Sequence, residues 1–303
     1  MNKILISTSS FAQYDKKPLE MIQESGYHYV LNEYKKKLSE NEILSLIEQH
    51  NPIGLIAGVE PITAQVLEKA KKLKVISRCG IGMDNIDIHA AKKHSIHIAN
   101  TPDGPTVAVA ELTLGLILSL FRKISLSHQN IQKSKWTRLM GNLINGKTIG
   151  IIGCGRIGSY LAKLLSNFGC TVLGFDIETK QNRGYKPVEL DELFKESDII
   201  TLHIPYTKDN HHLMNHESIS LMKKGAVLIN ASRGGLVDED ALYDMLLSGH
   251  LSGAALDCFE NEPYSGKLIH LENTVLTSHI GSYAIESRTM MEKQAVDNLL
   301  NLL

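Results

Sequence analysis

Short apolar runs alternate with segments of helical periodicity along the chain. In the first third, five runs rich in apolar and β-branched residues predict strands at 3–7, 27–31, 53–57, 75–78 and 96–100. Between them, residues 39–49 and 63–73 carry apolar positions three and four apart, and each segment begins at a Ser or Thr that can cap a helix. Strands that alternate with helices predict a parallel sheet covered by helices on both faces.

The same alternation restarts in the second part of the chain. Residues 108–121 predict a long helix that is apolar on nearly all sides, followed by a polar segment through Trp136. Six more strands are predicted at 148–152, 171–175, 199–203, 226–230, 254–258 and 275–279, with a last helix at 285–302. The pattern predicts an α/β protein with two doubly wound parallel-sheet domains. Their boundary is expected near residue 100, where the Pro- and Gly-containing segment 100–105 interrupts the pattern. Periodicity alone leaves open on which domain the last helix packs.

Composition narrows the class of protein. A chain of 303 residues is long for one core, which also favours two domains. Lys and Arg total 32 against 33 Asp and Glu, so neither a nucleic-acid partner nor a membrane surface is expected. The longest apolar stretch, 112–121, is too short to span a bilayer, and the first residues lack a signal-peptide pattern. The four cysteines show no paired spacing, so we expect free thiols in a cytoplasmic protein without a structural metal.

A glycine-rich loop gives the first chemical signal. Gly153, Gly155 and Gly158 form a GxGxxG pattern between the predicted strand 148–152 and a helix that runs through Asn167. Such glycines permit a tight turn, a close approach of a pyrophosphate and close packing of the helix on the strand. Alone, this pattern also fits a tight strand–helix turn that binds nothing.

An acidic residue makes dinucleotide binding the better interpretation. Asp176 lies eighteen residues beyond Gly158, at the end of the next predicted strand, near the spacing of the carboxylate that binds ribose hydroxyls. A carboxylate there repels the 2′-phosphate of NADP, and no Lys or Arg follows it directly. The sequence therefore predicts NAD as the cofactor.

Three polar residues at later strand ends are candidates for chemistry. Arg233 follows the strand 226–230, Glu262 follows 254–258, and His279 ends 275–279. Ligands of doubly wound sheets bind outside the carboxyl ends of the strands. A histidine can move a hydroxyl proton near neutral pH, a carboxylate can orient it, and an arginine can grip a carboxylate. Each residue alone is more often structural, and only their arrangement favours catalysis.

Several motifs together resemble the D-isomer-specific 2-hydroxyacid dehydrogenases, especially the phosphoglycerate dehydrogenase branch. They are the stretches 80–87, 100–102, 109–112 and 150–158 and the segments around Arg233, Glu262 and His279, in family order over nearly the whole chain. The resemblance implies a flavodoxin-like substrate domain, 1–100 plus 283–303, and an inserted Rossmann NAD domain, 101–282. It also implies that Arg233, Glu262 and His279 are catalytic.

The resemblance assigns the remaining site residues. The expected cofactor-binding residues are Gly153, Gly155, Arg156, Ile157, Gly158, Asp176, Pro205, Thr207, Ala231, Ser232, Asp257 and Gly281. The expected substrate-binding residues are Arg78, Cys79, Gly80, Ile81 and Gly82, with backbone amides of this loop on the substrate carboxylate. A homodimer joined through the helix after residue 108 is expected as well.

The sequence leaves several substrates, and one non-enzymatic function, as alternatives. Arg78 stands where phosphoglycerate enzymes of this family often carry a phosphate-facing arginine, which favours 3-phosphoglycerate and 3-phosphohydroxypyruvate. The stretch 57–60 lacks a second basic residue, and Pro105 stands where a polar Asn is usual, so hydroxypyruvate or glyoxylate reduction is the alternative. An NAD-sensing, corepressor-like binding protein is an alternative of another class. Because the chain ends at Leu303, we expect no appended regulatory domain.

A metal-dependent mechanism is the weakest interpretation. His211 and His212 are adjacent, and neighbours on an extended loop point apart. We expect them to be a solvated pair with no metal.

Overall fold

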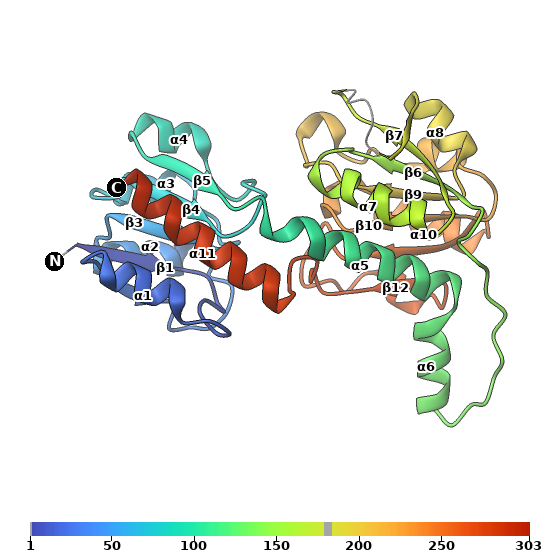
Figure 1. Cartoon of the computed structure of the whole chain (residues 1–303), viewed down its shortest axis with the longest axis horizontal. Helices are drawn as coiled ribbons and strands as arrows, with labels where there is room; N and C mark the ends of the chain where they lie inside the picture. The colour runs from blue at the N-terminus through green and yellow to red at the C-terminus, as the bar shows by residue number, and fades with distance from the viewer. Residues whose placement is uncertain (1, 179–183) are drawn as a thin grey trace. The chain divides into compact units, whose positions relative to one another are not determined.

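A computed structural model describes residues 2–178 and 184–303, and this part of the chain divides into two compact units (Figure 1). Unit 1 comprises Met1–Pro105 and Ser282–Leu303, and unit 2 comprises Thr106–Gly281. The boundaries thus fall at 105/106 and 281/282, a few residues from those expected at 100/101 and 282/283. Each unit contains one parallel sheet, as the alternation of strands and helices predicts.

Unit 1 is built on a five-stranded parallel sheet of order β2-β1-β3-β4-β5. Its strands are β1 (Lys3–Ile6), β2 (His28–Leu31), β3 (Gly54–Ala57), β4 (Val75–Arg78) and β5 (His97–Asn100). Its helices are α1 (Lys17–Glu24), α2 (Glu40–His50), α3 (Ala64–Lys69), α4 (Ile88–Lys93) and α11 (Ile285–Leu302). Ser39 caps α2 in a reciprocal capping box with Glu42, as its sequence position suggests.

Alternate residues of the unit 1 strands face two separate cores. Leu5, Leu55 and Ile76 pack with α2, α3 and α4 on one face of the sheet. Residues from the other face of the strands pack with α1 and α11. Periodicity could not assign the last helix; the structure places α11 on unit 1, where Met291 and Leu299 are fully buried.

Unit 2 is built on a seven-stranded parallel sheet of order β12-β11-β10-β9-β6-β7-β8. Its strands are β6 (Thr148–Ile152), β7 (Thr171–Phe175), β8 (Lys186–Pro187), β9 (Ile199–Leu202), β10 (Ala226–Asn230), β11 (Leu251–Leu256) and β12 (Thr274–Leu276). Its helices are α5 (Gly104–Phe121, entering from unit 1), α6 (Ile124–Gln132), α7 (Arg156–Asn167), α8 (Leu190–Glu196), α9 (His216–Ser220) and α10 (Glu239–Leu247), with 3-10 turns η1 (Lys208–Asn210), η2 (Gly234–Leu236) and η3 (Lys267–His270).

The long apolar helix α5 belongs to the core of unit 2. It is long and apolar enough to cross a membrane by composition, yet 56% of that window is buried inside the protein. Leu116, Ile117 and Leu120 pack with α7 and with one face of the sheet. Much of the broad apolar surface seen in the sequence is therefore covered within the chain itself.

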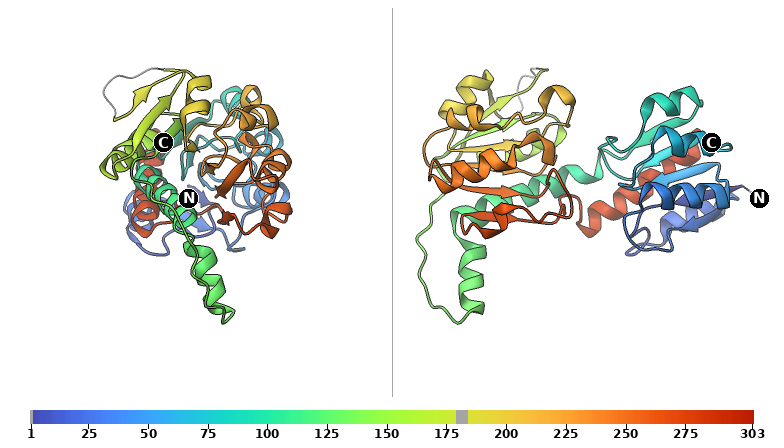
Figure 2. Two further views of the ribbon diagram at one scale, coloured as in Figure 1. Left: turned by 90° about the vertical axis from the view of Figure 1, so that its right-hand side faces the viewer. Right: turned by 180° about the vertical axis from the view of Figure 1, so that it is seen from behind.

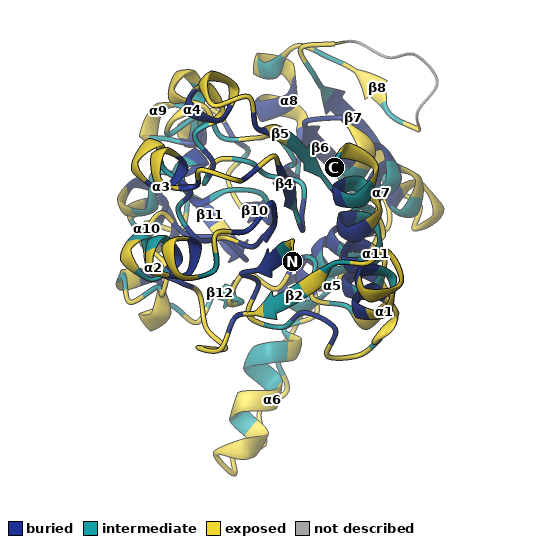
Figure 3. Ribbon diagram, turned by 90° about the vertical axis from the view of Figure 1, so that its left-hand side faces the viewer, coloured by how far each residue is buried: buried dark blue, intermediate teal, exposed yellow. Residues whose placement is uncertain are grey.

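The polar segment after α5 contains a helix that the sequence pattern did not predict. Helix α6 has no buried residue, and together with the segment that follows it extends away from the body of unit 2 (Figures 2 and 3). Trp136 and Met140 in the following segment are 83% and 92% exposed. The apolar residues of this arm are left without a core, which is why periodicity failed there.

Two strand ends differ from prediction in a way that matters for the site. Strand β11 ends at Leu256 rather than at residue 258, and β12 ends at Leu276 rather than at 279. The two-residue strand β8 was not predicted because it is too short to show alternation. Asp257 and His279 consequently lie in the loops beyond their strands.

Candidate active site

The polar candidates of unit 2 gather along one edge of its sheet. All strands are parallel, so their carboxyl ends share that edge. The loop after β6 carries the glycines, β7 is followed by Asp176, and β10, β11 and β12 are followed by Arg233, Glu262 and His279. The order of strands in space thus places residues far apart in sequence along one line.

The glycine loop has the geometry that a dinucleotide requires. Gly153 has φ of 96°, and a Cβ on Gly158 would lie 2.0 Å from the carbonyl oxygen of Gly153, so neither position accepts a side chain. Around Gly155, by contrast, the space that a Cβ would occupy is open. Gly155 is also the N-cap of α7, whose first amides attract an anion. Arg156 is exposed and Ile157 half-buried at the start of this helix.

Asp176 is tied to the glycine loop. Its carboxylate accepts hydrogen bonds from the amide of Cys154 at 2.7 Å and from the amide of Glu178 at 3.1 Å. A pocket beside it is lined by Gly174, Phe175, Asp176, Ile177, Tyr185, Pro187, Val188 and Glu189. This carboxylate, next to a pocket at the end of β7, fits the ribose of a nucleotide.

His279 and Glu262 form a close pair. Nδ1 of His279 lies 2.9 Å from Oε1 and 3.0 Å from Oε2 of Glu262, and Oε1 also accepts a hydrogen bond from the amide of Phe259 at 3.1 Å. With Nδ1 held by a carboxylate, Nε2 is the nitrogen left for substrate. The histidine is 43% exposed and has φ of 54°, a left-handed conformation that is uncommon for a side-chain-bearing residue.

Asp257 fixes the turn that carries His279. This fully buried carboxylate accepts hydrogen bonds from the Thr277 hydroxyl at 2.6 Å and from the amides of Ile280 and Gly281 at 2.8 Å each. The resemblance assigned Asp257 and Gly281 to cofactor binding, and sequence reasoning missed both this supporting role and Thr277. A buried acidic residue directly after a strand was the available signal.

Arg233 lies in a turn held by its neighbours. Asn230 donates its side-chain amide to the carbonyl of Arg233 at 2.8 Å and accepts from the amide of Ser232 at 3.1 Å. Nη1 of Arg233 donates to the carbonyl of Ser232 at 2.7 Å. Sequence reasoning also missed Asn230, whose fully buried amide fixes the backbone of this turn.

The other expected cofactor positions lie in the same row of loops. Ala231 and Ser232 follow β10, and the hydroxyl of Ser232 donates to the carbonyl of Ile204 in the loop after β9. Pro205 and Thr207 are exposed in that loop, where the side chain of Asn210 bridges them by accepting from the Thr207 amide and donating to the Pro205 carbonyl.

In unit 1, the expected substrate loop follows β4. Two of its backbone amides already make hydrogen bonds within unit 1. The amide of Cys79 donates to the carbonyl of Ala57 at 2.9 Å, and the amide of Gly80 donates to the Thr101 hydroxyl at 2.7 Å. The amides of Ile81 and Gly82 donate to no atom of residues 2–178 and 184–303. The guanidinium of Arg78 donates to the Cys79 carbonyl and covers Gly80.

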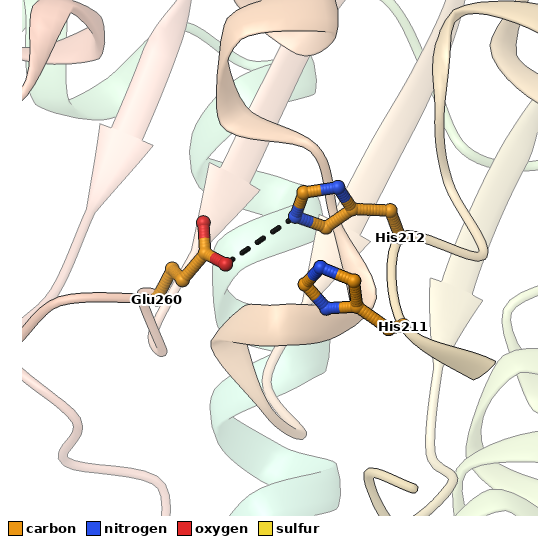
Figure 4. A group of neighbouring side chains, drawn as sticks. All are labelled: His211, His212 and Glu260. Atoms are coloured by element: carbon orange, nitrogen blue, oxygen red, sulfur yellow. Dashed lines mark ion pairs between the residues drawn. The ribbon is translucent and has the colours of Figure 1, made fainter. Parts of the chain in front are cut away.

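One prediction about side-chain direction was wrong. The rings of His211 and His212 do not point apart but stack, with centroids 3.7 Å apart and an interplanar angle of 26°. Figure 4 shows both rings facing the carboxylate of Glu260. The reason is local: His212 has φ of 53°, so the backbone is not extended there and the side chain turns back over its neighbour.

A dinucleotide loop and a carboxylate-held histidine on one sheet edge supply the two things that hydride transfer needs, a bound nicotinamide and a group that moves a proton. The fold and site therefore define an NAD-dependent dehydrogenase. More specifically, the chain belongs to the D-isomer specific 2-hydroxyacid dehydrogenase family, whose NAD binding domain model matches residues 114–281.

Relatives with several substrates support this placement. The chain is 36% identical to the hydroxypyruvate reductase of Thermotoga maritima, covering 94% of both chains. It is 40% identical to the D-3-phosphoglycerate dehydrogenase of Methanocaldococcus jannaschii over 83% of this chain, but spans only 49% of that protein. A crystal structure of a Thermus thermophilus protein superimposes with a TM-score of 0.91 at 35% identity, covering 99% of this chain and 96% of that one.

Proposed function

We propose that the chain transfers a hydride between NAD and a small D-2-hydroxy acid, with Arg233, Glu262 and His279 as the catalytic residues. The observation that carries this proposal is the contact of Nδ1 of His279 with both carboxylate oxygens of Glu262. Nε2 of His279 then gives a proton to the carbonyl oxygen of the 2-keto acid, or takes it from the hydroxyl of the 2-hydroxy acid. Glu262 keeps the imidazole in place and offsets its positive charge.

The cofactor assignment rests on the glycine loop and Asp176. The open space at Gly155 and the first amides of α7 suit the pyrophosphate, and Asp176 suits the ribose hydroxyls. The bound nicotinamide supplies or accepts the hydride. Asp176 would lie against the 2′-phosphate of NADP, so we propose a preference for NAD.

The substrate carboxylate is assigned to the loop after β4. The unused amides of Ile81 and Gly82 are the donors that this loop offers, rather than those of Cys79 and Gly80. Arg233 would orient the keto group and stabilise negative charge on its oxygen through its planar donors.

Hydroxypyruvate or glyoxylate is the substrate that the charges of unit 1 support best. Glu60, just beyond β3, is 1% exposed and accepts hydrogen bonds from the Ser7 hydroxyl and from the Gly58 amide. The loop that contains it follows β3, the neighbour of the strand that carries Arg78, and offers a buried carboxylate but no basic side chain. The phosphate group of a phosphorylated substrate, with its two negative charges, would therefore gain little binding energy beside this loop.

3-Phosphohydroxypyruvate and 3-phosphoglycerate form the second candidate pair. Arg78 favours it, because its half-buried guanidinium lies at the carboxyl end of β4 against the substrate loop. Although Nη1 donates to the Cys79 carbonyl, a guanidinium has four further N–H donors.

Steady-state oxidation of NADH against hydroxypyruvate, glyoxylate, 3-phosphohydroxypyruvate, pyruvate and 2-oxoglutarate tests these assignments. We expect the highest kcat/KM with hydroxypyruvate or glyoxylate and a lower value with NADPH. Absence of turnover with every 2-keto acid would contradict the enzymatic assignment and favour the NAD-sensing alternative. Arg78→Ala separates the substrate classes, since it should impair a phosphorylated substrate far more than glyoxylate.

We also propose that the chain forms a homodimer. The supporting feature is the arm of unit 2, which exposes Ile124, Ile131, Trp136, Met140 and Leu143. Exposed apolar groups gathered on one projecting segment are typical of a surface that a second copy covers. Light scattering should give twice the chain mass of 33.6 kDa, and Trp136→Asp should shift the protein toward monomer.

A further inference from the structure

A second group of possible metal ligands lies in unit 2, apart from the catalytic pair. One ligand atom from each of His211, His212 and Glu260 lies within 4.8 Å of the others. The two histidines follow η1, and Glu260 belongs to the loop after β11 (Figure 4). Imidazole nitrogens and a carboxylate oxygen are ligands that Zn²⁺ accepts readily.

The spacing of His212 and Glu260 suits a shared ion. Nε2 of His212 lies 3.4 Å from Oε1 of Glu260. Two ligands bound about 2.1 Å from a tetrahedral Zn²⁺ lie about 3.4 Å from each other. This nitrogen is buried, yet it makes no hydrogen bond to any atom of residues 2–178 and 184–303.

His211 can supply the third ligand by a small rotation. Its Nδ1 lies 3.3 Å from the hydroxyl of Tyr206, which leaves Nε2 for the ion and gives the ring an outer partner. Because the ring is exposed, a small turn about its side-chain bonds can bring Nε2 toward the position between His212 and Glu260. Stacked rings cannot both direct a lone pair at one ion, and binding therefore requires this rotation.

The backbone on both sides of the group is fixed. The amide of His212 donates to the carbonyl of Gly235 at 2.9 Å, and the amide of Glu260 donates to the carboxylate of Glu239 at 2.8 Å. A Cβ on Gly234 would lie 2.3 Å from the amide nitrogen of Glu260, so the two loops pack closely. The ligands thus come from anchored positions, and only side chains need to move.

The local charge favours a cation. Asp238 lies 4.0 Å from Nδ1 of His212, which adds a third carboxylate to Glu239 and Glu260 around two imidazoles. A divalent ion would offset this crowding of carboxylates.

We propose that His211, His212 and Glu260 form a binding site for one Zn²⁺ ion. Three protein ligands leave one position of a tetrahedral ion for water. The site does not include the catalytic residues, because Glu262 and His279 contact each other and neither is one of the three proposed ligands.

Calorimetric titration of the untagged, metal-free protein with zinc chloride tests the proposal. We expect one ion per chain, and an affinity at least about tenfold lower in each of His211→Gln, His212→Gln and Glu260→Gln, because loss of even an outer partner costs about 10- to 100-fold. His211 and Glu260 are exposed, so their variants should fold. His216→Gln, at an exposed position on α9, is the matched control and should bind as the wild type does.

The catalytic pair provides the competing outcome. Cys258, Glu262 and His279 also place ligand atoms within 4.8 Å of one another. Loss of binding in His279→Gln with retention in Glu260→Gln would overturn the proposal, as would absence of binding to the wild type. Retained binding in His279→Gln, together with loss in Glu260→Gln and His211→Gln, would support it.

Discussion

Two histidine–carboxylate groups lie on loops at the same edge of the unit 2 sheet, and they differ in how firmly they are held. His279 contacts Glu262 at 2.9 Å and 3.0 Å, whereas His212 is 3.4 Å from Glu260 without a hydrogen bond. Glu260 and Glu262 are only two residues apart. The residue types are the same, so the difference comes from the surroundings.

Buried support explains the difference. Asp257 is fully buried and accepts three hydrogen bonds from the turn that carries His279. The backbone of His212 is also anchored, to the Gly235 carbonyl. Glu262, however, accepts a hydrogen bond from the Phe259 amide, whereas Glu260 accepts none from the backbone within the described parts of the chain. A proton-transferring group gains from preorganisation, while a metal site can tolerate side chains that close on the ion.

Removal of the firmly held histidine should have the largest effect. His279→Ala should lower kcat by at least about 100-fold, the usual scale for loss of a positioned acid–base group. His211→Ala should lower it by less than about tenfold on the same scale. NADH oxidation with the best 2-keto acid measures both, and near-normal turnover of His279→Ala would remove the catalytic assignment.

Removal of the buried support should destabilise the protein. Asp257→Asn replaces an acceptor of two amides by a group that also carries a donor, and should lower the free energy of unfolding by about 1–3 kcal/mol. Asp238→Asn is the matched control, because Asn caps a helix as well as Asp does and Asp238 caps α10. Urea unfolding compares the two; equal midpoints would show that Asp257 is not needed for the turn.

Substitution of Glu262 should lower kcat more than substitution of Glu260. Glu262→Gln should lower kcat by at least about tenfold, because the amide no longer orients His279 or offsets its charge. Glu260→Gln should have a smaller effect on kcat in metal-free buffer. Steady-state kinetics of the two variants measure this difference. Equal losses of kcat would show that Glu262 contributes no more to turnover than Glu260 does.

A further histidine, His203, should affect only the pH dependence of stability. Burial lowers the pKa of His203 from 6.5 to about 4, while Nε2 contacts the Thr201 hydroxyl at 3.0 Å. The unfolded chain therefore binds more protons between pH 6.5 and 4, and stability falls as the pH drops through this range. The loss should be about 1 kcal/mol between pH 6.5 and 5.5.

Thermal unfolding of His203→Gln over the same pH range isolates this contribution. The variant should lose less stability than the wild type as the pH falls. Parallel curves for the two proteins would show that His203 is protonated equally in the folded and unfolded states.

The sequence by itself determined the class of fold and supplied the candidate residues for the chemistry. Period-two and 3.6-residue patterns follow from burial on one face of a strand or helix, so they predicted most strands, several to the residue, as at β4, β6 and β10. The GxGxxG loop and Asp176 were readable because backbone constraints there require particular residue types. Helix α6 and strand β8 were missed because neither carries a buried face, and the stacked histidines were missed because a left-handed residue is not visible in a sequence.

Only the tertiary structure decided which polar groups support which. The fold placed Asp257 against the turn of His279 and used the Cys79 and Gly80 amides internally, which leaves those of Ile81 and Gly82. These contacts join residues distant in sequence or depend on backbone direction, and local periodicity carries neither kind of information.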